Sequence, residues 1–320
     1  MSAYLDNTQV QNVTPRGIFI VKLFGGLCNQ LQCIAKGILL GQKYDKDIYI
    51  DVFHKNVYDN SKCLINEVLN ITELNCMLTK LNININILKT LDDDIVCNIK
   101  PLYGVEYDKI PTLINLNDII ELQENQNTRY LDIGAPVSLC IYESFGLHFV
   151  DYSNTYHSIT CNMPFHTKFY DLANTIKTQL NLTDYTCIHL RIEDDAIDYY
   201  SSAFNIEKAV LTNALLQFYT NHVEKNYDSR IYICTGLSYF KNTHNTFYKL
   251  LKTANSNIVD KQDFKIDNYY TQNRELLAII DYIIAKDATK FVGWGFSSFS
   301  ILLHVLHKNK DNPSELFKIE

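Results

Sequence analysis

Three short apolar segments, each followed at once by a turn and then by a helical pattern, constrain this chain more than any other feature. Residues 17–23 (GIFIVKL), 185–191 (YTCIHLR) and 290–293 (KFVG) are predicted to be buried strands. Strands that alternate with helices in this way are typical of α/β proteins with parallel sheets. Because such sheets bind ligands at the carboxyl ends of their strands, the polar residues that follow each segment are the candidate functional residues.

Arg191 is the leading candidate, since it ends one of these strands in a chain with only five arginines. A guanidinium keeps its charge and can hold two phosphate oxygens at once, so it suits a diphosphate better than a lysine does. The alternative is that Arg191 pairs with Glu193, Asp194 or Asp195 at the strand end. For a His-x-Arg sequence alone this alternative is favoured, but the two other strand ends reverse the preference.

The first strand runs into a double glycine and then into a helix, in the sequence FGGLCNQL. Gly25 and Gly26 permit a tight turn and a close approach of the backbone to a ligand, and the helix start offers unpaired N–H groups. Asn29 and Gln30 at this helix start are able to bond a sugar or a phosphate. Capping of the helix is an equally good explanation for both residues.

The last strand leads into a second glycine turn and a hydroxyl-rich helix start, in the sequence FVGWGFSSFS. Ser297, Ser298 and Phe299 occupy this helix start. Serine hydroxyls and backbone N–H groups at such a turn are predicted to form a phosphate cradle.

At these three stretches the chain resembles a known enzyme superfamily. Residues 25–51 look like the N-terminal glycine-Asn-Gln motif of α-1,2-fucosyltransferases. The sequence HLRIEDD resembles the His-x-Arg motif that those enzymes share with α-1,6-fucosyltransferases and protein O-fucosyltransferases, and residues 281–300 are similar to the third motif. The motifs lie in the family's order and cover roughly a fifth of the chain.

The resemblance implies an α/β fold of the GT-B type, in which two Rossmann-like domains face each other across a cleft. Residues 1–160 would form the acceptor-side domain, and residues 161–320 the domain that binds the nucleotide sugar. The implied reaction is an inverting, metal-independent transfer of fucose from GDP-fucose to a hydroxyl of a glycan or glycoprotein acceptor. Neither a metal nor another cofactor is expected, because Arg191 and the serine turn would stabilise the leaving diphosphate.

The resemblance also implies which residues act. Arg191 and Asp194 are the predicted catalytic residues, with the general base open among Asp194, Asp195, Glu193 and Asp198. The segment RIYICTG resembles the strand beside the donor nucleotide, which adds Gly236. The predicted donor-binding residues are Gly25, Gly26, Asn29, His189, Arg191, Asp194, Gly236, Ser297, Ser298 and Phe299.

Two departures from the family pattern leave alternatives open. Ile192 stands where many fucosyltransferases have a second basic residue, so the hold on phosphate would rest more on one arginine. The acidic residues 193–195 resemble a plant branch of the superfamily, some of whose members use rhamnose. The alternatives are therefore a rhamnosyltransferase or another nucleotide-deoxysugar transferase, and a catalytically silent carbohydrate-binding protein.

Composition and motif absences narrow the function classes. The net charge of −7 argues against nucleic acid as the main partner. No GxGxxG follows a strand, which disfavours a Rossmann dehydrogenase. Nine scattered cysteines without a CxxC pair indicate reduced core residues, and no apolar run reaches 18 residues. We therefore expect a soluble, cytoplasmic protein without a membrane anchor.

Periodicity predicts the remaining elements. Helices are predicted over residues 28–43, 60–71, 111–122, 164–180, 206–223, 275–286 and 297–306. Strands are predicted over residues 48–52, 83–90, 130–133, 230–234 and 258–260.

A triple acid at Asp92, Asp93 and Asp94 contains an Asp-x-Asp pattern. Clustered carboxylates suit Mg²⁺ or Mn²⁺, and another glycosyltransferase class uses such a pattern to hold a metal and the donor diphosphate. An exposed turn is the preferred interpretation, because no matching apolar strand directly precedes these residues.

Overall fold

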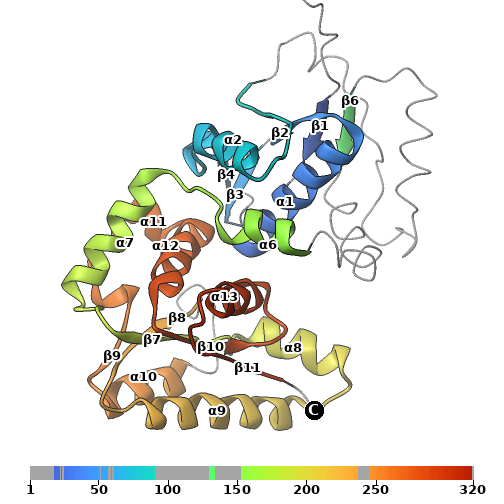
Figure 1. Ribbon diagram of the computed structural model, residues 1–320. Coiled ribbons are helices and arrows are strands. Elements are labelled where there is room, and N and C mark those ends of the chain that lie inside the picture. The colour runs from blue at the N-terminus through green and yellow to red at the C-terminus, as the bar shows by residue number, and fades with distance from the viewer. Residues whose placement is uncertain are drawn as a thin grey trace, which may run out of the picture.

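The computed structural model describes residues 18–21, 23, 25–50, 52–56, 59, 61–90, 130–133, 153–236 and 245–318. The triple acid at residues 92–94 and the helix predicted over residues 111–122 lie outside these ranges. Within them the chain forms two α/β lobes, each built on a parallel sheet (Figure 1).

The N-terminal sheet is parallel and has the strand order β5-β2-β1-β6. Its strands are β1 (Ile18–Val21), β2 (Asp47–Ile50), β5 (Ile87–Leu88) and β6 (Tyr130–Ile133). Helix α1 (Leu27–Tyr44) joins β1 to β2, which confirms the strand-helix-strand unit expected at the start of the chain. The predicted strand over residues 83–90 is shorter, since only the two residues of β5 pair with β2.

The helix predicted over residues 60–71 is wrong. Strands β3 (Val52–Asn56) and β4 (Ser61–Leu64) pair as an antiparallel hairpin there, followed by a 3-10 turn η1 (Ile65–Glu67). Helix α2 (Ile71–Lys80) begins only after Asn70, whose side chain accepts the Glu73 N–H at 3.2 Å. An Asn at this position satisfies an orphan amide of the first turn and therefore sets the helix start.

The C-terminal sheet is parallel, with the strand order β11-β10-β7-β8-β9. The order reverses between β7 and β10, because the chain first adds β8 and β9 on one side of β7 and then β10 and β11 on the other. Ligands of open α/β sheets bind at such a switch point, outside the carboxyl ends of the strands. The strands are β7 (Tyr185–His189), β8 (Arg230–Cys234), β9 (Ile258–Asp260), β10 (Lys290–Trp294) and β11 (Ser314–Phe317).

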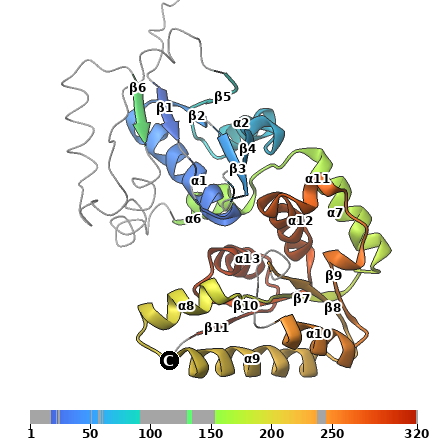
Figure 2. The same ribbon diagram turned by 180° about the vertical axis from the view of Figure 1, so that it is seen from behind.

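Helices cover both faces of this sheet, with α9 and α10 on one side and α12 and α13 on the other (Figures 1 and 2). Neighbouring residues of one strand therefore enter different cores: Cys187 packs in the cluster with α12 and α13, and Ile188 in the cluster with α9. Such two-sided burial is why these strands are continuous apolar runs. The helices of this lobe are α7 (Thr167–Gln179), α8 (Asp194–Ala203), α9 (Lys208–Lys225), α10 (Asn245–Ala254), α11 (Asn268–Thr271), α12 (Arg274–Asp287) and α13 (Ser298–Lys308), with a 3-10 turn η4 (Lys261–Asp263).

The first of these two apolar clusters, which contains Cys187, includes residues of both lobes. Helix α1 packs against α12, α13 and α6 (Ser153–Cys161), and α12 also contacts β3. Helix α1 therefore lies against helices α12 and α13 of the C-terminal lobe (Figure 1). The predicted division into residues 1–160 and 161–320 falls in the last turn of α6 and stays a prediction.

Two further sequence expectations concern composition. Each of the seven cysteines within the described ranges is a free thiol, and five of them are buried. Among the helices that the structure describes, every one is too short or too polar to cross a lipid bilayer.

Candidate active site

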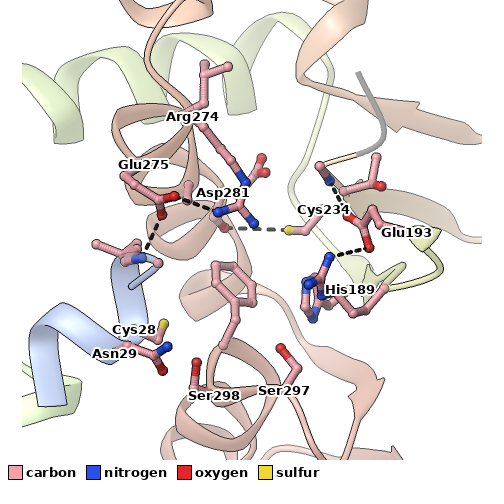
Figure 3. A pocket seen from close by; sticks show the side chains of 18 of the residues that line it. Cys28, Asn29, His189, Glu193, Cys234, Arg274, Glu275, Asp281, Ser297 and Ser298 are labelled. Atoms are coloured by element: carbon pink, nitrogen blue, oxygen red, sulfur yellow. Dashed lines mark hydrogen bonds and ion pairs between the residues drawn. The ribbon is translucent and has the colours of Figure 1, made fainter. Parts of the chain in front are cut away.

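A cavity of about 360 Å³ lies at the switch point of the C-terminal sheet (Figure 3). The residues after β7, β8 and β10 line one part of it, and the first turns of α1 and α12 line another. Of the ten predicted donor-binding residues, Gly25 and Asp194 are described but do not line it. The other eight line it: Gly26, Asn29, His189, Arg191, Gly236, Ser297, Ser298 and Phe299.

Arg191 lies two residues beyond the end of β7 and is held in two carboxylate contacts. Its Nη1 is 2.8 Å from Glu193 Oε2, and its Nη2 is 3.0 Å from Asp195 Oδ2. Burial lowers the pKa of the guanidinium, but Glu193 and Asp195 more than offset this and raise it. The side chain is 18% exposed. The structure is compatible with both interpretations of the sequence, because Arg191 pairs with acidic residues and also lines the cavity.

Backbone contacts fix the chain around Arg191. The Tyr219 hydroxyl on α9 donates to the His189 carbonyl at 3.0 Å and accepts the Arg191 N–H at 3.3 Å. Tyr219 is fully buried, so this support comes from the core of the lobe. The Leu190 N–H also donates to the Cys234 carbonyl of β8 at 2.8 Å, so both β8 and Tyr219 hold the extension beyond β7.

The acidic residues after Arg191 are not a loop, because they form the N-cap and first turn of α8. Glu193 is the buried N-cap residue, and its Oε1 accepts the Gly236 N–H at 2.9 Å. Acidic residues are favoured at a helix start by the helix dipole, which explains their clustering. Glu193 and Asp195 line the cavity, whereas Asp194 does not, and Asp198 pairs with Lys208 at 2.6 Å. The catalytic role predicted for Asp194 stays a prediction.

His189 is held as a neutral ring. Its Nδ1 lies 2.7 Å from Ser300 Oγ, which itself accepts the Trp294 N–H at 3.0 Å. Ser300 has no other acceptor among the described residues, so its hydroxyl proton points to Nδ1 and the ring proton sits on Nε2. Burial, with the charges of Arg191, Lys261 and Arg274, lowers the pKa of His189 well below its usual range. His189 therefore offers a hydrogen-bond donor without a charge.

Gly293 makes the contact between His189 and Ser300 possible. A Cβ at this position would lie 2.4 Å from Ser300 Oγ and 2.8 Å from its Cβ. We expect Gly293→Ala to lower the free energy of unfolding by about 1–3 kcal/mol, because the strand and the helix are both buried and have no room to separate. Urea denaturation would measure this loss, and an unchanged midpoint would contradict the close packing of β10 on α13.

The turn between β10 and α13 keeps polar groups for a ligand. Ser297 is the N-cap residue of α13 but makes no side-chain capping bond, so its hydroxyl and the first N–H groups of the helix remain for an anion. The Phe299 ring lies 4.6 Å from the His189 ring, measured between centroids. The Tyr200 hydroxyl donates to the Phe296 carbonyl at 2.5 Å and helps to hold the turn. The phosphate cradle expected at this turn stays a prediction.

The start of α1 departs from its prediction, because its N-terminus already binds a carboxylate. The Leu27 N–H donates to Glu275 Oε2 at 2.6 Å, so this amide is not open to a ligand. Gly25 does need to be glycine, since its φ is +72° and a Cβ there would lie 2.7 Å from Asn29 Nδ2. Asn29 lines the cavity, and its contact with a ligand stays a prediction.

Gln30 serves the fold rather than a ligand or a cap. Its side-chain amide donates to the carbonyls of Gly25 and His54, each at 3.0 Å, and its Oε1 accepts the His54 N–H at 3.0 Å. The residue is fully buried. Gln30 thereby ties the glycine turn to β3.

A buried ion pair at the cavity wall was not predicted. Lys261 Nζ lies 2.5 Å from Asp281 Oδ2 and donates to the Thr235 carbonyl at 2.7 Å, and the Tyr232 hydroxyl donates to Asp281 Oδ1 at 2.8 Å. Burial alone would lower the pKa of Lys261, but Asp281 raises it, so Lys261 stays charged. One sequence signal pointed here, since Asp281 interrupts the apolar helix sequence LLAIIDYII.

Within the described ranges, no three His, Cys, Asp or Glu side chains are grouped closely enough to hold a metal ion. Among the described residues, three cationic side chains line the cavity, namely those of Arg191, Lys261 and Arg274. Each of them contacts at least one carboxylate.

Neither protein-family models nor curated proteins match this sequence. Solved structures match its fold. Fucosyltransferase NodZ from Bradyrhizobium aligns with a TM-score of 0.53 at 10% identity, over 92% of this chain and 94% of that one. POFUT1 in complex with GDP-fucose aligns with a TM-score of 0.57 at 11% identity, over 97% and 99%. NodZ α-1,6-fucosyltransferase co-crystallized with GDP aligns with a TM-score of 0.53 at 8% identity, over 92% of this chain and 93% of that one. This chain has the fold of the GT-B fucosyltransferases.

The predicted GT-B fold class is therefore confirmed, and each lobe of the pair carries its own parallel sheet. The likeness extends over nearly the whole of both chains, so it includes both lobes of the GT-B fold. At such low identity it concerns the fold, and the roles of individual residues must come from the cavity itself.

Proposed function

We propose that this protein is an inverting glycosyltransferase that moves fucose from GDP-fucose to a hydroxyl of a glycan or protein. The observation that carries the proposal is Arg191, a permanent cation that lines the cavity at the switch point of the C-terminal sheet. His189 and the turn at Ser297 line the same cavity. Similar folds solved with this donor, POFUT1 in complex with GDP-fucose and NodZ soaked with GDP-fucose, support the choice of donor.

The chemistry requires charge stabilisation at the leaving group. The acceptor oxygen forms a bond to the anomeric carbon of the sugar, the bond from that carbon to the β-phosphate oxygen breaks, and a base takes the acceptor proton. Negative charge grows on the β-phosphate during this step. Arg191 would neutralise it, with the Ser297 hydroxyl and the first amides of α13 as further donors. Preorganised donors of this kind lower the barrier by about 3–4 kcal/mol each.

Donor binding requires an exchange of partners at Arg191. Its fork is occupied by Asp195 through two contacts, at 3.3 and 3.0 Å. Glu193 is buried and tied to Gly236, whereas the Asp195 side chain is 42% exposed. Asp195 is thus the partner that can turn to solvent when phosphate oxygens take its place, because exposed ion pairs contribute only about 0–1 kcal/mol.

Calorimetric titration of the full chain with GDP, UDP and GDP-fucose tests the proposal. We expect uptake of GDP and GDP-fucose, followed by slow donor hydrolysis in a panel of nucleotide sugars. Preference for another base, or hydrolysis of a rhamnose donor only, would replace fucose with another deoxysugar. A folded protein that takes up no nucleotide would be a silent member of the fold, and the proposed activity would be wrong.

Chelation provides a separate prediction. Because Arg191 and the serine turn would supply the positive potential at the diphosphate, we expect transfer to proceed at the same rate with and without EDTA. The measurement is the rate of fucose transfer or donor hydrolysis after dialysis against the chelator. Strict dependence on Mn²⁺ would contradict this expectation and would direct attention to the acids at residues 92–94.

A further inference from the structure

Arg274 reaches the cavity from the start of α12, which the sequence motifs do not cover. It is the first residue of α12, and its side chain is 21% exposed. Arg274 lies at the cavity (Figure 3). Arg191, which follows the end of β7, lines the same cavity. Two arginines from different elements therefore converge on one space.

Glu275 fixes the position of Arg274. Its Oε1 lies 2.6 Å from Arg274 Nη1, and its Oε2 accepts the Leu27 N–H at 2.6 Å. The carboxylate is almost fully buried, so both of its oxygens are committed to these partners. Gly26 lies directly beside the pair, since a Cβ there would be in ordinary van der Waals contact, 3.4 Å from Glu275 Oε2 and 3.6 Å from Arg274 Nη1. The arginine is thus held in place before any ligand arrives.

The other cations at the cavity differ in access. Lys261 is 5% exposed and is bound to Asp281 and to the Thr235 carbonyl, which leaves little of its ammonium group for a ligand. Ile192 occupies the position of the second basic residue in the family motif, and it is fully buried in the apolar core. Among the described residues that line the cavity, Arg274 is thus the accessible cation besides Arg191.

We propose that Arg274 supplies the second cation of the diphosphate site, in the role that residue 192 does not fill. The inference rests on the proposed donor and adds a residue from a different wall of the cavity. Arg191 and Arg274 would hold the β-phosphate, the group that a nucleoside monophosphate lacks, from two walls of the cavity. The two guanidinium groups then neutralise together the negative charge of the diphosphate, which a single arginine would otherwise have to neutralise alone.

The test compares two ligands on one substitution. We expect Arg274→Gln to weaken GDP binding by roughly tenfold to a hundredfold, the loss typical of one charged hydrogen-bonded contact. Binding of guanosine monophosphate (GMP) should change by much less, because it lacks the β-phosphate. Calorimetry or fluorescence titration of both ligands gives the ratio. A change that merely loosened the cavity would weaken both ligands alike.

Two further variants make the result interpretable. Arg274→Lys keeps the charge but loses the fork, so it should retain part of the GDP preference even if the glutamine variant folds poorly. Arg230→Gln removes an arginine at the amino end of β8, where Nε donates to the Leu180 carbonyl at 3.0 Å, and should leave the ratio unchanged. Equal losses for GDP and GMP, or no loss in either Arg274 variant, would overturn the inference. Absence of GDP binding by the wild-type chain would instead overturn the proposed function.

Discussion

Replacing Arg191 with alanine is expected to abolish measurable sugar transfer and to lower GDP affinity strongly. The guanidinium is a permanent cation that lines the cavity together with the neutral His189 and the serine turn, and the diphosphate would lose its main charged partner. Loss of a single preorganised donor typically reduces kcat by about 10²–10³-fold. The measurements are donor hydrolysis, transfer and GDP titration on the same preparation. Near-normal turnover would remove Arg191 from the mechanism.

The Arg191 substitution also affects the fold, because Glu193 would lose its cation. The Glu193 carboxylate is buried and would keep only the Gly236 N–H, so we expect about 1–3 kcal/mol of lost stability. The double variant Arg191→Met with Glu193→Gln removes both charges together. It should regain stability without regaining transfer, which separates the loss of function from the loss of fold.

The organisation of the C-terminal lobe could be predicted because it depends on local patterns. The strand before His189 is buried on both faces and therefore appears as a continuous apolar run, and the hydroxyl-rich turn at Ser297 marks the helix that follows β10. Both features are confined to a few consecutive residues. The parallel topology then brings the ends of β7 and β10 to the same edge of the sheet. His189, Arg191, Ser297, Ser298 and Phe299 meet for this reason.

The contacts that complete the cavity could not be predicted, because they join distant parts of the chain. Glu275 binds the amide of Leu27, 248 residues away, and nothing in the sequence near either residue specifies that pairing. The acidic residue at 275 appears in the sequence as an ordinary first-turn helix residue. Because Glu275 accepts the Leu27 N–H, this amide after the glycine turn binds a protein carboxylate instead of a ligand phosphate.

The element errors have the same origin. The segment around Cys63 has residues at spacings compatible with a helix, but pairing with Phe53 in the neighbouring strand overrides that local preference. Strand β11 was not predicted, since its four residues are partly exposed and gain their conformation from pairing with β10. In each case a partner elsewhere in the chain decided the structure.

The ion pair of Lys261 and Asp281 is expected to have the largest single effect on stability. Asp281→Ala would leave a charged lysine that is 5% exposed without its counter-charge. Breaking a buried pair in this way typically costs about 3–5 kcal/mol. Asp287→Ala on the same helix is the matched control, because its ion pair with Lys177 is exposed and should contribute less than about 1 kcal/mol. Denaturant unfolding of the two variants gives the difference.

The pH dependence of Asp281→Asn identifies the charge on Lys261 as the cause. In the wild-type chain Asp281 raises the pKa of Lys261 in the folded state. The charged Lys261 therefore stabilises the fold up to the pKa of a lysine in the unfolded chain, near 10.5, and this stability is lost as the pH rises through the folded pKa. Without the carboxylate, burial lowers the pKa of Lys261 in the folded state below the unfolded value. The unfolded chain of the variant then binds more protons than its folded chain, so the free energy of unfolding of the variant should increase as the pH rises from 7 towards 10. In the wild type the contribution of Lys261 to the free energy of unfolding stays constant over this range. A constant deficit across that range would mean that lost hydrogen bonds, rather than an unpaired charge, explain the effect. Substitution of both residues by apolar side chains should restore most of the stability, because the desolvation cost of the pair disappears with it.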